Sequence, residues 1–154
     1  MYHHVMVPLD GSELAECVFP HLEVVARGCN VEEVTLVRVV EPLHLRGGVE
    51  THIPPEERQR LEGSAINIAR SYLDRIVERL KQGGLTVESE VLYGKVIDEL
   101  ADFTNKNEVD LIIISTHGHS GISRWVWGNT ADRILRAVCA PVFMVRAPGC
   151  VVGI

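Results

Sequence analysis

The hydrophobic positions of the chain switch repeatedly between short continuous runs and a helical spacing. Continuous apolar runs, typical of strands covered on both faces, occupy residues 5–9, 34–40, 111–114 and 142–145. Residues 86–92 instead alternate between apolar side chains and glutamates, which predicts a half-exposed strand at a sheet edge. We therefore expect five strands.

Stretches with helical periodicity separate these runs. The predicted helices cover residues 12–26, 56–80, 97–103 and 130–137. In the first helix, Ser12 is a candidate N-cap and Gly28 lies just past the end, while Pro20 is expected to bend the helix. The second helix has the longest apolar stripe, from Leu61 to Leu80, with charged residues opposite it.

Strands and helices alternate along the whole chain. This order predicts a three-layer α/β fold built on a doubly wound, parallel, five-stranded sheet with right-handed crossovers. The 154 residues suffice for one core and are too few for two, so we expect a single domain over residues 1–154. The segment 42–55 contains two glycines and three prolines without periodicity, so we expect a long loop there.

Composition and charge narrow the classes of partner. The chain has 15 basic and 21 acidic residues, a net charge of −6, so it has no basic field to attract nucleic acid. No apolar run approaches the roughly 20 residues that span a bilayer, and the start lacks signal-peptide features. We therefore expect a cytoplasmic protein without membrane contact. Its four cysteines form no C-x-x-C pair, which disfavours a disulfide framework or a zinc site.

Candidate chemistry lies where strands end, because ligands of doubly wound sheets bind at the carboxyl ends of the strands. Glycines 118, 121 and 128 follow the fourth strand and let backbone N–H groups approach a ligand closely. Asn129 and Thr130 open the last helix, whose positive end favours a phosphate. These residues predict a phosphate cradle. On spacing alone, an equally good interpretation is that the glycines make turns and that Asn129 or Thr130 caps the helix.

Other kinds of site find less support. The chain has neither a Walker A loop nor a G-x-G-x-x-G motif. His117 and His119 lack a carboxylate or cysteine that would complete a metal-ligand set. Ser12, His117 and Asp10 have the residue types of a catalytic triad, but the serine lacks the G-x-S-x-G elbow. We therefore assign no catalytic and no metal-binding residues.

Several segments together resemble a known family. After the fourth strand, Ser115, Gly118, Gly128 and Asn129 are separated by two, nine and no residues. The universal stress protein family has glycine, two residues, glycine, nine residues, glycine and then serine or threonine at this place. The opening segment 7–13, Glu41 and the closing segment 140–145 also resemble the family, over essentially the whole chain. The resemblance implies a sheet with strand order 3-2-1-4-5, as in the adenine nucleotide alpha hydrolase-like folds.

The resemblance implies a site for an adenine nucleotide, ATP or else ADP or AMP, with Mg²⁺. Asp10 would lie near the ribose and adenine, and the Val39 backbone would meet the adenine edge. Backbone N–H groups at Gly118 and Gly128 would reach the phosphates. The candidate nucleotide-binding residues are Pro8, Leu9, Asp10, Val39, Ile114, Ser115, Gly118, Gly121, Arg124, Gly128, Asn129 and Thr130.

The family resemblance also implies a homodimer that pairs through the edge strand 142–145 and acts as a regulator in the stress response. Two departures bear on the nucleotide: Ser115 replaces the first glycine, and Asn129 replaces the terminal hydroxyl residue. An amide still donates a hydrogen bond and caps a helix, so we expect binding to be impaired at worst. These departures motivate one alternative, a dimeric interaction module that binds no nucleotide. A slow ATPase is the other, although the sequence offers no convincing general base.

Overall fold

The fold is a parallel sheet between two layers of helices, as predicted. The computed structural model describes residues 2–43, 53–116 and 129–147. The elements in chain order are β1 (His4–Pro8), the 3-10 helix η1 (Ala15–Val18), α1 (Phe19–Cys29), β2 (Glu33–Val40), α2 (Pro55–Gln82), β3 (Val87–Tyr93), α3 (Val96–Lys106), β4 (Leu111–Ser115), α4 (Asn129–Ala137) and β5 (Val142–Val145). The five strands pair in parallel in the order β3-β2-β1-β4-β5. Both the fold class and the strand order are confirmed.

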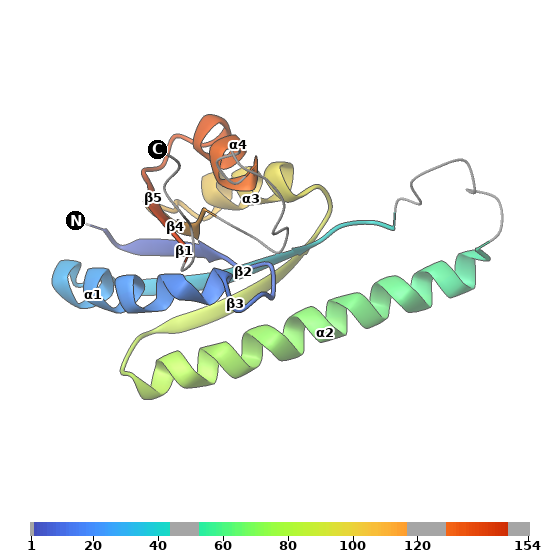
Figure 1. The fold of residues 1–154 in the computed structure, drawn as a ribbon, viewed down its shortest axis with the longest axis horizontal. Coiled ribbons are helices and arrows are strands. Elements are labelled where there is room, and N and C mark those ends of the chain that lie inside the picture. The colour runs from blue at the N-terminus through green and yellow to red at the C-terminus, as the bar shows by residue number, and fades with distance from the viewer. Residues whose placement is uncertain (1, 44–52, 117–128, 148–154) are drawn as a thin grey trace, which may run out of the picture.

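Helices cover both faces of this sheet, with α1 and α2 on one side and α3 and α4 on the other (Figure 1). Successive side chains of β1 therefore enter different cores: Val5 and Val7 pack with α1 and α2, whereas Met6 packs with α3 and α4. The central strands need apolar residues at nearly every position because both of their faces are buried. The exception is β3, which lies at the sheet edge and is half exposed, as its alternating glutamates predicted.

The first helical segment differs from the prediction. It divides into η1 and α1, and Pro20 lies in the first turn of α1, where its missing N–H costs no helical hydrogen bond. The expected bend at Pro20 was therefore wrong. The helix also runs past Gly28 and ends at Asn30, which takes the left-handed conformation at φ 53°. Ser12 is the N-cap of neither helix, because Leu14 precedes η1 and Val18 precedes α1, although the Ser12 Oγ accepts the Ala15 N–H at 3.2 Å.

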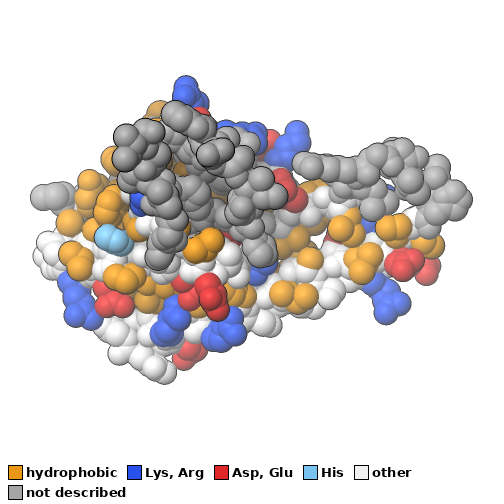
Figure 2. Space-filling view, viewed as in Figure 1, with side chains coloured by type: hydrophobic (Ala, Val, Ile, Leu, Met, Phe, Trp, Pro, Cys, Tyr) orange, Lys and Arg blue, Asp and Glu red, His pale blue; other side chains and the backbone are white. Residues whose placement is uncertain are grey.

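Helix α2 extends well beyond the sheet (Figure 1). Its 28 residues span about 42 Å at a rise of about 1.5 Å per residue. Only its C-terminal half is covered, so Leu73 is fully buried while Leu61 and Ile68 are 47% and 62% exposed. Hydrophobic side chains are accordingly visible along the arm that α2 forms (Figure 2). In the described ranges, no helix is both long and apolar enough to span a bilayer.

Leu73 and Leu61 offer a matched test of this division of α2. Leu73→Ala should lower the free energy of unfolding by about 2–5 kcal/mol, because it leaves a cavity under the helix. Leu61→Ala should change it by no more than about 0.5 kcal/mol, because that side chain is largely in water. Urea unfolding followed by circular dichroism measures both values. Equal losses for the two variants would contradict the position of α2 on the sheet.

Candidate functional site

The first candidate site is the region beyond the carboxyl end of β1, between β2 and β4, which we call the crevice. This strand is the middle strand of the sheet, and its pairing with β4 ends earlier along the strand than its pairing with β2. The ladder with β4 ends at the pair Met6 and Ile112, and the ladder with β2 ends at the pair Pro8 and Val37. The Leu9 N–H donates to the Val37 carbonyl at 2.8 Å, and the chain then turns away from the sheet. Strand order reverses here, which is where such sheets bind ligands.

The backbone of Val39 faces this crevice. In a strand, alternate residues direct both backbone polar groups to the same side. The Val34 N–H donates towards β3 and the Val40 carbonyl accepts from the Gly94 N–H, so the even-numbered residues of β2 face β3. Val39 therefore directs its N–H and carbonyl to the β1 side. It does so two residues beyond Val37, where the β1 ladder ends.

The same reasoning places Ser115 on the opposite wall of the crevice. The Ile112 and Thr116 N–H groups donate to the Pro141 and Val145 carbonyls at 2.9 Å, so even-numbered residues of β4 face β5. Ser115 therefore directs its backbone towards β1. The backbones of Val39 and Ser115 thus approach the end of β1 from its two sides.

Asp10 follows β1 at the mouth of the crevice. Its Oδ1 accepts the Ser12 N–H at 2.9 Å and the Ser12 hydroxyl at 2.6 Å, which closes an Asx turn. Gly11, at φ +89°, takes a conformation that favours glycine. The turn holds the Asp10 carboxyl group in a defined position.

The structure brings one part of the predicted site together. Six predicted residues lie at the carboxyl ends of β1, β2 and β4, namely Pro8, Leu9, Asp10, Val39, Ile114 and Ser115. Asn129 and Thr130 form the start of α4, where Thr130 is exposed. Gly118, Gly121, Arg124 and Gly128 lie outside the described residues, as do His117 and His119. The described residues contain no group of three or more histidine, cysteine or acidic side chains that could hold a metal ion.

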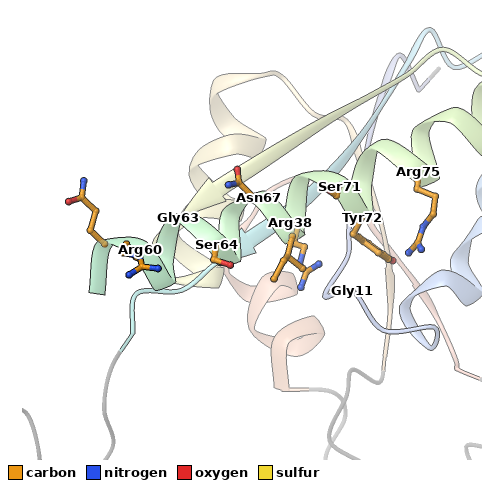
Figure 3. A pocket seen from close by; sticks show the side chains of 11 residues that line it. Gly11, Arg38, Arg60, Gly63, Ser64, Asn67, Ser71, Tyr72 and Arg75 are labelled. Atoms are coloured by element: carbon orange, nitrogen blue, oxygen red, sulfur yellow. The ribbon is translucent and has the colours of Figure 1, made fainter. Parts of the chain in front are cut away.

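A second hollow, which the sequence did not suggest, lies between α2, β2 and the turn after β1 (Figure 3). Its volume is about 840 Å³, and its walls are Gly11, Arg38, Gln59, Arg60, Gly63, Ser64, Asn67, Ile68, Ser71, Tyr72 and Arg75. We call it the α2 cleft. The only sequence signal is a row of polar residues on α2 at three- and four-residue spacing, which runs from Arg60 to Arg75 beside the apolar stripe.

Tyr72 forms the floor at one end of the α2 cleft. Its hydroxyl donates to Glu16 Oε1 at 3.2 Å, and the guanidinium carbons of Arg38 and Arg75 lie 5.3 and 5.8 Å from its ring centre. Burial, together with the Glu16 carboxylate, raises the pKa of Tyr72 far above its usual value. The raised pKa keeps the phenol neutral in alkaline solution as well as at physiological pH, so its O–H remains available to donate to Glu16.

Comparison with known proteins agrees with this architecture. The model of the universal stress protein family matches residues 1–146. Universal stress protein MJ0531 of Methanocaldococcus jannaschii is 25% identical over 149 residues, which cover 96% of this chain and 84% of that protein. The solved structure of protein MJ0577 of the same organism has a TM-score of 0.83 at 23% identity and covers 97% of this chain and 99% of its own.

Two further solved structures share the fold and contain nucleotides. A universal stress protein in complex with cAMP has a TM-score of 0.68 at 19% identity, covering 94% of this chain and 96% of its own. A family member from Arabidopsis thaliana with AMP bound has a TM-score of 0.65 at 14% identity, covering 96% of this chain and 93% of its own. Because the family model matches nearly the whole chain, this protein belongs to the universal stress protein family.

Proposed function

We propose that this protein binds an adenine nucleotide in the crevice at the end of β1 and acts as a dimeric regulator. The observation that carries the proposal is the direction of the Val39 backbone. Its N–H and carbonyl point into the crevice beyond the end of the β1–β2 ladder. One donor beside one acceptor on an extended backbone matches the donor and acceptor edge of adenine.

Asp10 and Ser115 complete the nucleoside part of the proposed site. The Asp10 carboxylate stands at the mouth of the crevice and accepts hydrogen bonds, as ribose hydroxyls require. Ser115 follows Ile114 at the end of β4, opposite Val39. Because Ser115 stands where the family has a glycine, its side chain would narrow the crevice next to the sugar. We expect this to lower the affinity for the nucleotide without abolishing binding.

The start of α4 supplies the phosphate end of the proposed site. Its first N–H groups have no carbonyl partner within the helix, and its dipole is positive there. Asn129 and Thr130 begin this helix, and the glycines at 118 and 128 precede it in the sequence. ATP is the proposed ligand, and Mg²⁺ would neutralise part of the charge of its phosphates. The family members with cAMP and AMP support a nucleotide as the class of ligand.

The outer edge of β5 supports the dimer. Pro141 and Val145 direct their carbonyls to β4, so the intervening Met144 directs its backbone away from the sheet. An uncovered strand edge is a template for pairing with another chain, and a two-fold axis lets two copies pair through the same strand. We propose that the protein acts through this dimer on a partner, because we assign no catalytic residues to the crevice.

Thermal unfolding with millimolar Mg-ATP tests the nucleotide site. Ligand at about 100 times its Kd adds about 2.7 kcal/mol of stability, which raises the melting temperature of a domain this size by about 5–10 °C. AMP should also raise it and GTP should not, because guanine carries its acceptor (O6) and donor (N1–H) in the opposite order to the donor and acceptor of adenine. Replacing Gly118 and Gly128 with leucine should reduce the effect of ATP more than that of AMP. If no nucleotide shifts the melting temperature, the chain is an interaction module without this ligand.

Met144 offers a test of the dimer. Met144→Pro removes an outward N–H without breaking a bond to β4, so it should abolish strand pairing between two copies while the domain still folds. Met144→Ala is the matched control, because it loses the same side chain and keeps the N–H. Sedimentation equilibrium at micromolar concentration should show dimers for the wild type and Met144→Ala and monomers for Met144→Pro. A Met144→Pro dimer would place the interface elsewhere.

A further inference from the structure

We propose that the α2 cleft is a second ligand site, which binds a phosphate group of a small anionic molecule through Arg38 and Arg75. This site goes beyond the proposed nucleotide crevice and does not depend on it. The argument rests on the charge of the cleft, on the arrangement of its arginines and on its place in the fold.

The charge of the cleft is opposite to that of the protein. The chain carries a net charge of −6, yet three arginines and no acidic residue line the α2 cleft. In the described part of the chain, Arg38, Arg60 and Arg75 form no ion pair with a carboxylate within 4.0 Å. A cleft with uncompensated guanidinium groups attracts an anion, and phosphate matches their geometry.

Two of these arginines are held in place before any ligand arrives. In Figure 3 the Tyr72 side chain lies between those of Arg38 and Arg75, and its ring centre is 5.3 and 5.8 Å from their guanidinium carbons. Gly11 supports Arg38 from the other side, where an added Cβ atom would lie 2.8 Å from the guanidinium carbon. The two guanidinium groups beside this ring repel each other, and an anion bound next to them in the cleft reduces that repulsion.

The nearest carboxylates already have other partners. Glu16 accepts hydrogen bonds from the Tyr72 hydroxyl and from Arg79, the latter at 2.9 Å. Asp10 accepts both hydrogen bonds from Ser12.

The rest of the cleft suits the body of a small polar molecule. Ser71, Asn67 and Ser64 continue from Arg75 along one face of α2 to Arg60, a distance of about 22 Å along the helix. Their hydroxyl and amide groups both donate and accept hydrogen bonds. A volume of about 840 Å³ falls within the range of small-molecule sites, which is about 300–1,000 Å³.

The α2 cleft and the nucleotide crevice lie on different sides of the sheet. Arg38 points to the layer of α1 and α2, where it contacts Tyr72. Its neighbour Val39 packs with the core under α3 and α4, and α4 belongs to that layer. We therefore expect a nucleotide with its phosphates at the start of α4 to leave Arg38 and Arg75 accessible.

Isothermal titration calorimetry with tripolyphosphate tests this site on the full chain. The titration is run in the presence of saturating AMP, or in its absence if AMP does not bind. We expect Arg75→Gln and Arg38→Lys each to weaken binding about tenfold. Arg75→Gln removes a charge-assisted hydrogen bond, and Arg38→Lys removes a bidentate one. Arg70→Gln is the matched control: it lies on the same helix outside the cleft and should change the affinity less than twofold. Melting temperatures show whether each variant is folded.

Three results would overturn the proposal. The first is no binding of tripolyphosphate at millimolar concentration. The second is an equal loss for Arg70→Gln and Arg75→Gln, which would indicate diffuse attraction to a surface. The third is that hexaglutamate, titrated in the same way, binds as tightly as tripolyphosphate and is weakened equally by Arg75→Gln, which would identify an acidic peptide as the ligand. A result in which AMP binding fails but the arginine variants weaken tripolyphosphate binding would sink the nucleotide proposal alone.

Discussion

The structure depends on the central strand β1, which is hydrogen-bonded to β2 and β4 and covered by helices on both faces (Figure 1). This hydrogen bonding stops near the carboxyl end of the strand. The ladders of β1 end at Ile112 on one side and at Val37 on the other. Beyond them, β2 and β4 continue, and Val39 and Ser115 direct their backbones to the β1 side. The crevice is therefore a consequence of how the strands diverge, and Val39 and Ser115 line it through their backbones.

Alternation along β2 distributes the chemistry between two sides. Neighbouring residues point to opposite faces, so Arg38 reaches the layer of α2 while Val39 packs under the other layer. The turn after β1 contributes to both proposed sites, because Asp10 lies at the mouth of the crevice and Gly11 lies against Arg38 in the α2 cleft. One short strand end thus positions a proposed nucleotide site and a proposed phosphate site that do not compete for space.

The strands and the order of elements could be predicted because burial on both faces demands continuous apolar runs, as in residues 111–114. The division of the first helical segment into η1 and α1 could not be predicted. A proline occurs in the first turn of a helix as well as at a kink, and only packing decides which occurs at Pro20. Periodicity placed Leu61 on the stripe of α2 but does not say how far the sheet extends beneath the helix. The α2 cleft was missed because Gly11, Arg38 and Tyr72 meet only in the folded chain.

The central claim is that the Val39 backbone binds the edge of adenine, and Val39→Pro tests it most directly. This substitution removes the Val39 N–H without breaking a hydrogen bond to β3. Calorimetric titration of AMP into this variant, with Val39→Ala as the matched control, compares the loss of one hydrogen bond with the loss of a side chain. The account predicts affinity close to wild type for Val39→Ala and about a tenfold loss or more for folded Val39→Pro, because a buried partner on adenine is left unsatisfied. Equal affinity of the two variants would contradict the proposed position of the adenine.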